Sequence, residues 1–101
     1  MRILMKVSVP HEAFNAAVRD GSVASKMAAI VEALGPEAVY YTEMNGRRTA
    51  ILIVEMANAS QIPSLVEPWF LTFGADVELH PVMSPQDLQQ AGLEGLGKKW
   101  G

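Results

Sequence analysis

The pair Asn45-Gly46 restricts the fold of this chain more than any other feature, because it separates two β-rich runs. A tight two-residue hairpin turn needs positive φ at both central residues, which Asn and Gly adopt most readily. The surrounding segment, AVYYTEMNGRRTAILIVEM, is rich in the β-branched and aromatic residues typical of strands. We therefore expect two adjacent antiparallel strands joined at this turn.

Two further runs have the pattern of strands. Residues 2–9, RILMKVSV, alternate between apolar residues and a mixed set, which indicates a strand with one buried face. The stretch ADVELHPVM, residues 75–83, alternates in the same way. Because Pro81 lacks a backbone N–H, this last strand is expected at an edge of the sheet.

Helical periodicity fills the segments between these strands. Residues 11–34 carry two apolar stripes about half a turn apart, so we expect a break at Asp20-Gly21-Ser22, with Ser22 capping the second part. Ser60 is expected to cap another helix, which Pro68 should kink and Gly74 should end. Ser84-Pro85 predicts a short helix to about residue 90.

The predicted element order is βαββαβ. With right-handed crossovers this order gives an α+β, ferredoxin-like fold, with a four-stranded antiparallel sheet in the order 4-1-3-2 and the helices on one face. We expect one such domain over residues 1–88. Residues 89–101, QQAGLEGLGKKWG, are expected to form a flexible tail because they are rich in glycine.

Composition excludes several classes of function. The net charge is −3 and the basic residues are scattered, which argues against nucleic-acid binding. No apolar run is long enough to span a membrane, and the chain has no cysteine, so we expect a soluble cytoplasmic protein. No cofactor or nucleotide motif is present, and we predict no bound cofactor. A metal site is disfavoured because His11 and His80 should lie at opposite ends of the sheet.

The runs NGRRTAILIVEM and VELHPVM, with Trp69 between them, resemble small ferredoxin-like proteins of unknown function in the dimeric α/β-barrel superfamily. The resemblance covers residues 2 to about 88. It implies a homodimer and a ligand pocket, without implying a reaction. The apolar content also predicts a dimer, because the strand AILIVEM, residues 50–56, has apolar residues on both faces and helices can cover only one.

Candidate site residues lie on the sheet face away from the helices. Glu55 and His80 should reach the same end of this face, roughly 10 Å apart, and are the candidate catalytic residues for proton transfer beside a carbonyl group. Tyr40 or Tyr41 could add a phenol. The predicted ligand-binding set is Leu4, Lys6, Tyr41, Ile53, Glu55, Glu78 and His80.

Three functions remain open at this point. The first is a homodimeric protein that binds a small apolar ligand on the sheet face. The second is a cofactor-free oxygenase or isomerase that uses His80 and Glu55. The third is a purely structural interaction module whose sheet face is filled by its partner. Glu55 and His80 can also be read simply as residues at which two strands reach solvent. Trp69 lies on the apolar stripe of its helix and is expected in the core.

Overall fold

The computed structural model describes residues 1–101, the whole chain. Strands and helices alternate along the domain, and two short helices follow it. In chain order the elements are β1 (Arg2–Val9), α1 (His11–Asp20), α2 (Val23–Leu34), β2 (Ala38–Met44), β3 (Arg47–Glu55), the 3₁₀ turn η1 (Ala59–Gln61), α3 (Ile62–Phe73), β4 (Asp76–Pro81), α4 (Pro85–Gln90) and α5 (Leu93–Trp100).

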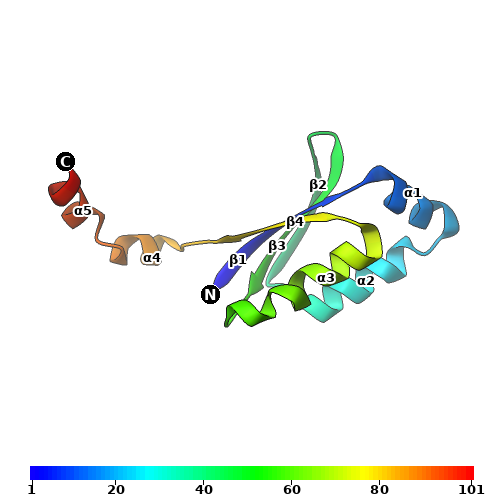
Figure 1. Cartoon of the computed structure of the whole chain (residues 1–101), viewed down its shortest axis with the longest axis horizontal. Coiled ribbons are helices and arrows are strands. Elements are labelled where there is room, and N and C mark those ends of the chain that lie inside the picture. Colours follow the sequence, from blue (N-terminus) through cyan, green and yellow to red (C-terminus); the bar gives the residue numbers. More distant parts are fainter.

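The four strands form one sheet in the order β2-β3-β1-β4, and every neighbouring pair is antiparallel. Helices α2 and α3 lie together on one side of the sheet (Figure 1). This is the predicted ferredoxin-like α+β fold, with β4 and its Pro81 at an edge. The hairpin is also confirmed, because Asn45 and Gly46 have φ values of 56° and 76°.

The core lies between the sheet and the helices. Alternate residues of β1 and β3 point into it, and the side chains of Met5, Val7 and Leu52 are completely buried. Trp69 and Phe73 of α3 cover them from the helical side. Trp69 is 0% exposed, so the prediction that it belongs to the core is confirmed.

The first helical segment is broken where the two apolar stripes change phase. Gly21 ends α1 with a φ of 82°, a conformation that costs glycine little. The Asp20 carboxylate accepts a hydrogen bond of 2.8 Å from the Ser22 N–H. Hydrogen bonding from Ser22 lowers the pKa of Asp20. Ser22 occupies the predicted N-cap position of α2, but its hydroxyl makes no capping hydrogen bond.

Helix α3 begins differently from the prediction. The cap comes from Asn58, which forms a reciprocal capping box with Gln61 at the 3₁₀ turn, and not from Ser60. The helix then continues through Pro68 to Phe73 and ends at Gly74, whose φ is 61°. Glycine at this end was predicted, whereas the preceding 3₁₀ turn had no distinct signal in the sequence.

Residues 84–101 form what we call the C-terminal arm. As predicted, α4 begins at Ser84-Pro85, and Ser84 forms a capping box with Asp87. Within the expected tail, residues 93–100 form helix α5, whose apolar residues recur at helical spacing. Lys98 and Lys99 lie in its last turn, where positive charge is favourable. The arm extends away from the domain (Figure 1), and the molecule is 59 Å long.

Candidate functional site

The sheet face opposite the helices, which we call the open face, carries most of the predicted site residues. Leu4 of β1 is paired with Ile53 on one side and with His80 on the other. Lys6 is paired with Glu78 in the same way. Directly paired residues point to the same side of an antiparallel sheet, so these side chains share one face, as predicted.

Three charged or titratable side chains form a line across β1 and β4. His80 Nε2 lies 3.1 Å from Glu78 Oε1, and Lys6 Nζ lies 3.5 Å from Glu78 Oε2. The hydrogen bond with His80, and then the positive charge of Lys6, lower the pKa of the Glu78 carboxyl. His80 is therefore engaged with its neighbour on the same strand.

Glu55 lies apart from His80. It is paired with Arg2, whereas His80 is paired with Leu4, so two strand spacings and a step of two residues separate them. This amounts to about 12 Å between backbones. The Glu55 carboxylate contacts the Met1 amine, and neither Glu55 nor His80 lines a cavity. The predicted acid–base pair does not form within one chain.

The two tyrosines of β2 point to opposite faces. Tyr40 is paired with Ile51 and belongs to the open face, where it is 70% exposed. Tyr41 is paired with Ala50 and lies on the helical side. Grouping Tyr41 with the open face is therefore wrong. The sequence could not show which tyrosine faces the helices, because two adjacent tyrosines fit either of the two alternation patterns of a strand.

A pocket of about 420 Å³ lies on the helical side, beneath the β2–β3 hairpin. Trp69 and Ala50 form its inner wall and are buried, whereas Tyr41 and Thr42 are exposed at its mouth. Most of the lining is apolar, as is typical of small-molecule sites. The lining residues are Val9, Phe14, Met27, Tyr41, Thr42, Arg48, Thr49, Ala50 and Trp69.

Arg48 is the one charged residue in this lining. Its Nη1 donates a hydrogen bond of 2.8 Å to Asn15 Oδ1 on α1, and its guanidinium lies over the Phe14 ring, 4.5 Å from the ring centre. The carboxylate opposite it on β2, Glu43, accepts instead from the Gly46 N–H. Arg48 therefore forms no ion pair.

Sequence reasoning missed this pocket, although a signal was present. Ala50, Leu52 and Val54 mark the core-facing phase of β3, and Arg48 falls in the same phase. A charged residue in a core-facing position needs a partner or a ligand. The indole N–H of Trp69 is a second unusual group, because Nε1 is buried without a hydrogen-bond partner.

No group of three His, Asp or Glu side chains is arranged to hold a metal ion. None of the helices combines the length and the apolar character needed to cross a bilayer.

Comparison with known proteins gives a family and a distant structural likeness. Residues 11–96 match the family profile described as a domain of unknown function, DUF3303. No curated protein matches the sequence. Among solved structures, the de novo designed protein Ferredog-Diesel is similar, with 8% identity and a TM-score of 0.45 over 80% of this chain and 85% of the design.

Proposed function

The chain belongs to the DUF3303 family, a domain of unknown function, and we propose from its geometry that it is a homodimeric protein that binds a small, mostly apolar molecule. The observation that carries the proposal is the pocket of about 420 Å³ beneath the β2–β3 hairpin. Its volume lies within the roughly 300 to 1,000 Å³ typical of small-molecule sites. Its few polar groups stand beside an apolar wall, which suits binding better than catalysis.

The open face supports the dimer. Leu4, Ile51 and Ile53 are only half-buried there and no helix covers them. Soluble monomers seldom leave a contiguous apolar patch uncovered. We propose that a second copy of the chain covers this face through a two-fold interface.

The surface area of the single chain also supports a partner. One chain exposes 6775 Å². A compact monomer of 11.0 kDa should expose about 5,600 Å². The radius of gyration is 17.0 Å, against about 13 Å for a compact domain of this length. The excess of about 1,200 Å² is more than the roughly 800 Å² that each partner buries in a standard interface.

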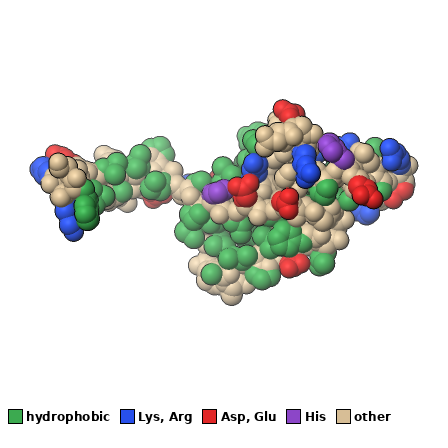
Figure 2. Space-filling model, turned by 45° about the horizontal axis from the view of Figure 1, so that its top comes forward, with side chains coloured by type: hydrophobic (Ala, Val, Ile, Leu, Met, Phe, Trp, Pro, Cys, Tyr) green, Lys and Arg blue, Asp and Glu red, His purple; other side chains and the backbone are tan.

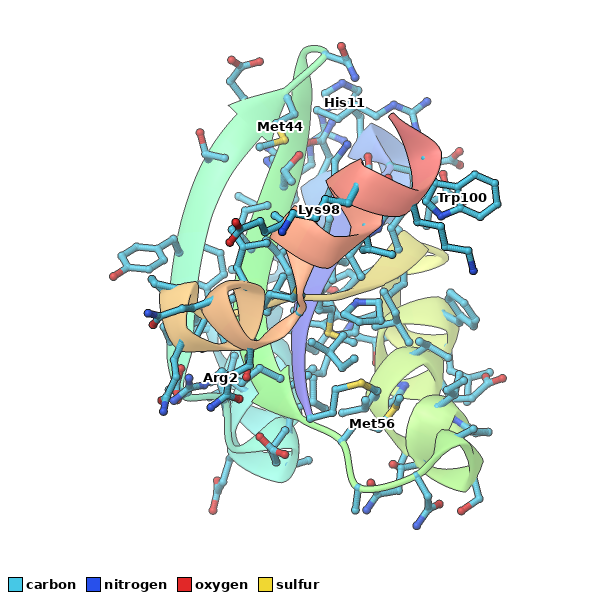
Figure 3. The ribbon with its side chains drawn as sticks, turned by 90° about the vertical axis from the view of Figure 1, so that its left-hand side faces the viewer. Arg2, His11, Met44, Met56, Lys98 and Trp100 are labelled. Atoms are coloured by element: carbon cyan, nitrogen blue, oxygen red, sulfur yellow. The ribbon has the colours of Figure 1, made fainter.

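The C-terminal arm accounts for much of this excess. Leu88, Leu93, Leu96 and Trp100 are all exposed on it. Apolar side chains run along the arm in Figure 2, and Trp100 and Lys98 extend from different sides of α5 in Figure 3. We propose that the arm packs against the second copy, because its apolar side chains have no cover within their own chain.

Filling the pocket tests the binding function. Ala50→Leu adds a larger side chain on the pocket wall, whereas the matched control Ala28→Leu adds the same group at an exposed position of α2 outside the lining. Native mass spectrometry of the wild-type protein should show a dimer with a retained small molecule. Ala50→Leu should lose that molecule and Ala28→Leu should keep it. Retention of the same molecule by Ala50→Leu would contradict this location.

The oxygenase or isomerase alternative has less support. It requires Glu55 and His80 to act on one substrate, and each is engaged with a different group. A purely structural module has less support for another reason, because such a protein has no need of a pocket beside a fixed arginine. We further propose a cytoplasmic location, which the absence of cysteine supports.

A further inference from the structure

We infer that the molecule bound in this pocket carries a carboxylate, which Arg48 binds, attached to an apolar body that contacts Phe14, Met27 and Trp69. The inference rests on the proposed binding function and specifies the chemical class of the ligand. It follows from the fixed position of Arg48, from the hydrogen-bonding groups of the lining and from the size of the cavity.

Arg48 is already held in place. Asn15 accepts a hydrogen bond from Nη1, and the Phe14 ring supports the plane of the guanidinium. A guanidinium has five N–H donors, so Nε and Nη2 keep donors that no protein group uses. A planar group fixed in this way binds a carboxylate with two parallel hydrogen bonds at little cost in side-chain entropy.

The polar groups of the lining favour an anion. Arg48 can only donate hydrogen bonds. Thr42 and Thr49 are paired with each other in the open-face phase, so their hydroxyls point away from the pocket. The Tyr41 phenol lies on an exposed side chain at the mouth, and no acidic residue is in the lining. A cationic ligand would therefore find a positive charge and no counter-charge, whereas a carboxylate supplies the acceptors that Arg48 lacks.

The apolar lining determines the rest of the ligand. The volume of about 420 Å³ accommodates on the order of a dozen non-hydrogen atoms, taking about 30 Å³ for each water-sized group. Six of the nine lining residues are hydrophobic. A phosphate dianion suits such a wall less well, because a single arginine cannot balance its charge. A ring with a short acidic side chain fits both the size and the polarity.

The test uses the full chain with Trp100→Phe, which leaves Trp69 as its one tryptophan. Binding is followed by Trp69 fluorescence and by its indole N–H signal in ¹⁵N NMR spectra. The probes are 3-phenylpropanoate, its uncharged analogue 3-phenylpropanamide, the cation 3-phenylpropylamine and inorganic phosphate. We expect the acid to bind at least about tenfold more tightly than the amide, because an ionic hydrogen bond is stronger than a neutral one.

Substitution of Arg48 then identifies the group that selects the acid. Arg48→Gln should weaken binding of the acid at least about tenfold and leave binding of the amide unchanged. The matched control is Arg47→Gln, since Arg47 is exposed, lies next to Arg48 and is outside the lining. It removes the same charge from the chain and should change neither affinity.

The outcomes separate the two proposals. If none of the organic probes shifts the Trp69 signals, the proposed binding function fails. If acid and amide bind equally, or if phosphate displaces the acid, the pocket binds small molecules and the carboxylate inference is overturned. The comparison of acid with amide needs no variant, so the inference stays testable even if Arg48→Gln does not fold.

Discussion

The guanidinium of Arg48 lies 4.5 Å from the centre of the Phe14 ring and so joins β3 to α1 across the mouth of the pocket. Phe14 in turn contacts Phe73 of α3, with ring centres 5.5 Å apart. One side chain of the sheet is thereby connected to two helices. The same contacts that orient Arg48 for a ligand should also stabilise the fold.

Replacing Arg48 with Gln should therefore lower the free energy of unfolding. The change removes a cation–π contact worth roughly 0.5 to 2 kcal/mol and replaces a charged hydrogen bond, worth roughly 1.5 to 3 kcal/mol, by a neutral one at best. We expect a net loss of about 1 to 2 kcal/mol in urea denaturation. Asn15→Ala should lose less, because it keeps the contact with Phe14. Equal stability of all three proteins would show that Arg48 does not anchor α1.

The pKa of Glu78 should depend on His80. The His80 hydrogen bond is the largest cause of the lowered pKa, so His80→Phe should raise the pKa of Glu78 toward its ordinary value of 4.5. His11→Phe is the matched control and should leave it unchanged. NMR titration of the side-chain carboxyl measures both. The interpretation fails if the two variants titrate alike.

The sign of the effect on stability follows from this shift. The pKa of Glu78 is lower in the folded chain than in the unfolded chain, so the interaction stabilises the fold above about pH 4.5. This contribution is lost as the pH falls through the folded-state pKa. The difference in urea midpoint between the wild-type protein and His80→Phe should therefore shrink as the pH falls through this range.

A charge on the open face should separate the dimer. Ile53→Asp places a carboxylate among the half-buried apolar side chains beside Leu4. Burying it in an interface would require an unpaired charge, so light scattering should report a monomer at micromolar concentration. Leu71→Asp is the control, because Leu71 is 82% exposed on α3 and lies outside this face. A monomeric wild-type protein would remove the proposed dimer altogether.

The C-terminal arm should contribute to the same assembly. Leu96→Glu changes an apolar side chain of α5 that is 47% exposed. If the arm packs on the second copy, this change should weaken dimerisation at least about tenfold, since it buries a charge at an apolar contact. Gln89→Glu adds the same negative charge at an exposed position of α4 and should have little effect. An unchanged dimer affinity in Leu96→Glu would place the arm outside the interface.

The sequence predicts the sheet well because its signals are local. Asn45-Gly46 defines the hairpin, and the alternation in β1 and β3 determines which residues enter the core. The two wrong predictions, the helix cap at Ser60 and the face of Tyr41, also have physical reasons. Asn58 replaces Ser60 as a cap because capping depends on which side chain faces the free N–H groups, and Tyr41 lies on the other face because two adjacent tyrosines define no phase.

The candidate site was harder to predict because it depends on tertiary contacts. Glu55 and His80 are kept apart because their pairing partners on β1, Arg2 and Leu4, differ by two residues. This offset cannot be read from the position of either residue in its own strand. The pocket is assembled from several strands and helices, and Arg48 is held there by Asn15, 33 residues earlier in the chain. The residues around Arg48 or Asn15 in the sequence do not indicate that contact.

Because the helical segment is broken at Gly21, α1 can open separately from α2, which one unbroken helix could not do. Only Ala17 of this helix is fully buried, and its backbone hydrogen bonds are not continuous with those of α2. Local opening of α1 should therefore require less free energy than opening of the sheet beneath it, and its amide protons should exchange with deuterium sooner. Because Phe14 and Asn15 lie on α1, such an opening would break their contacts with Arg48 and widen the pocket while the strands stay paired.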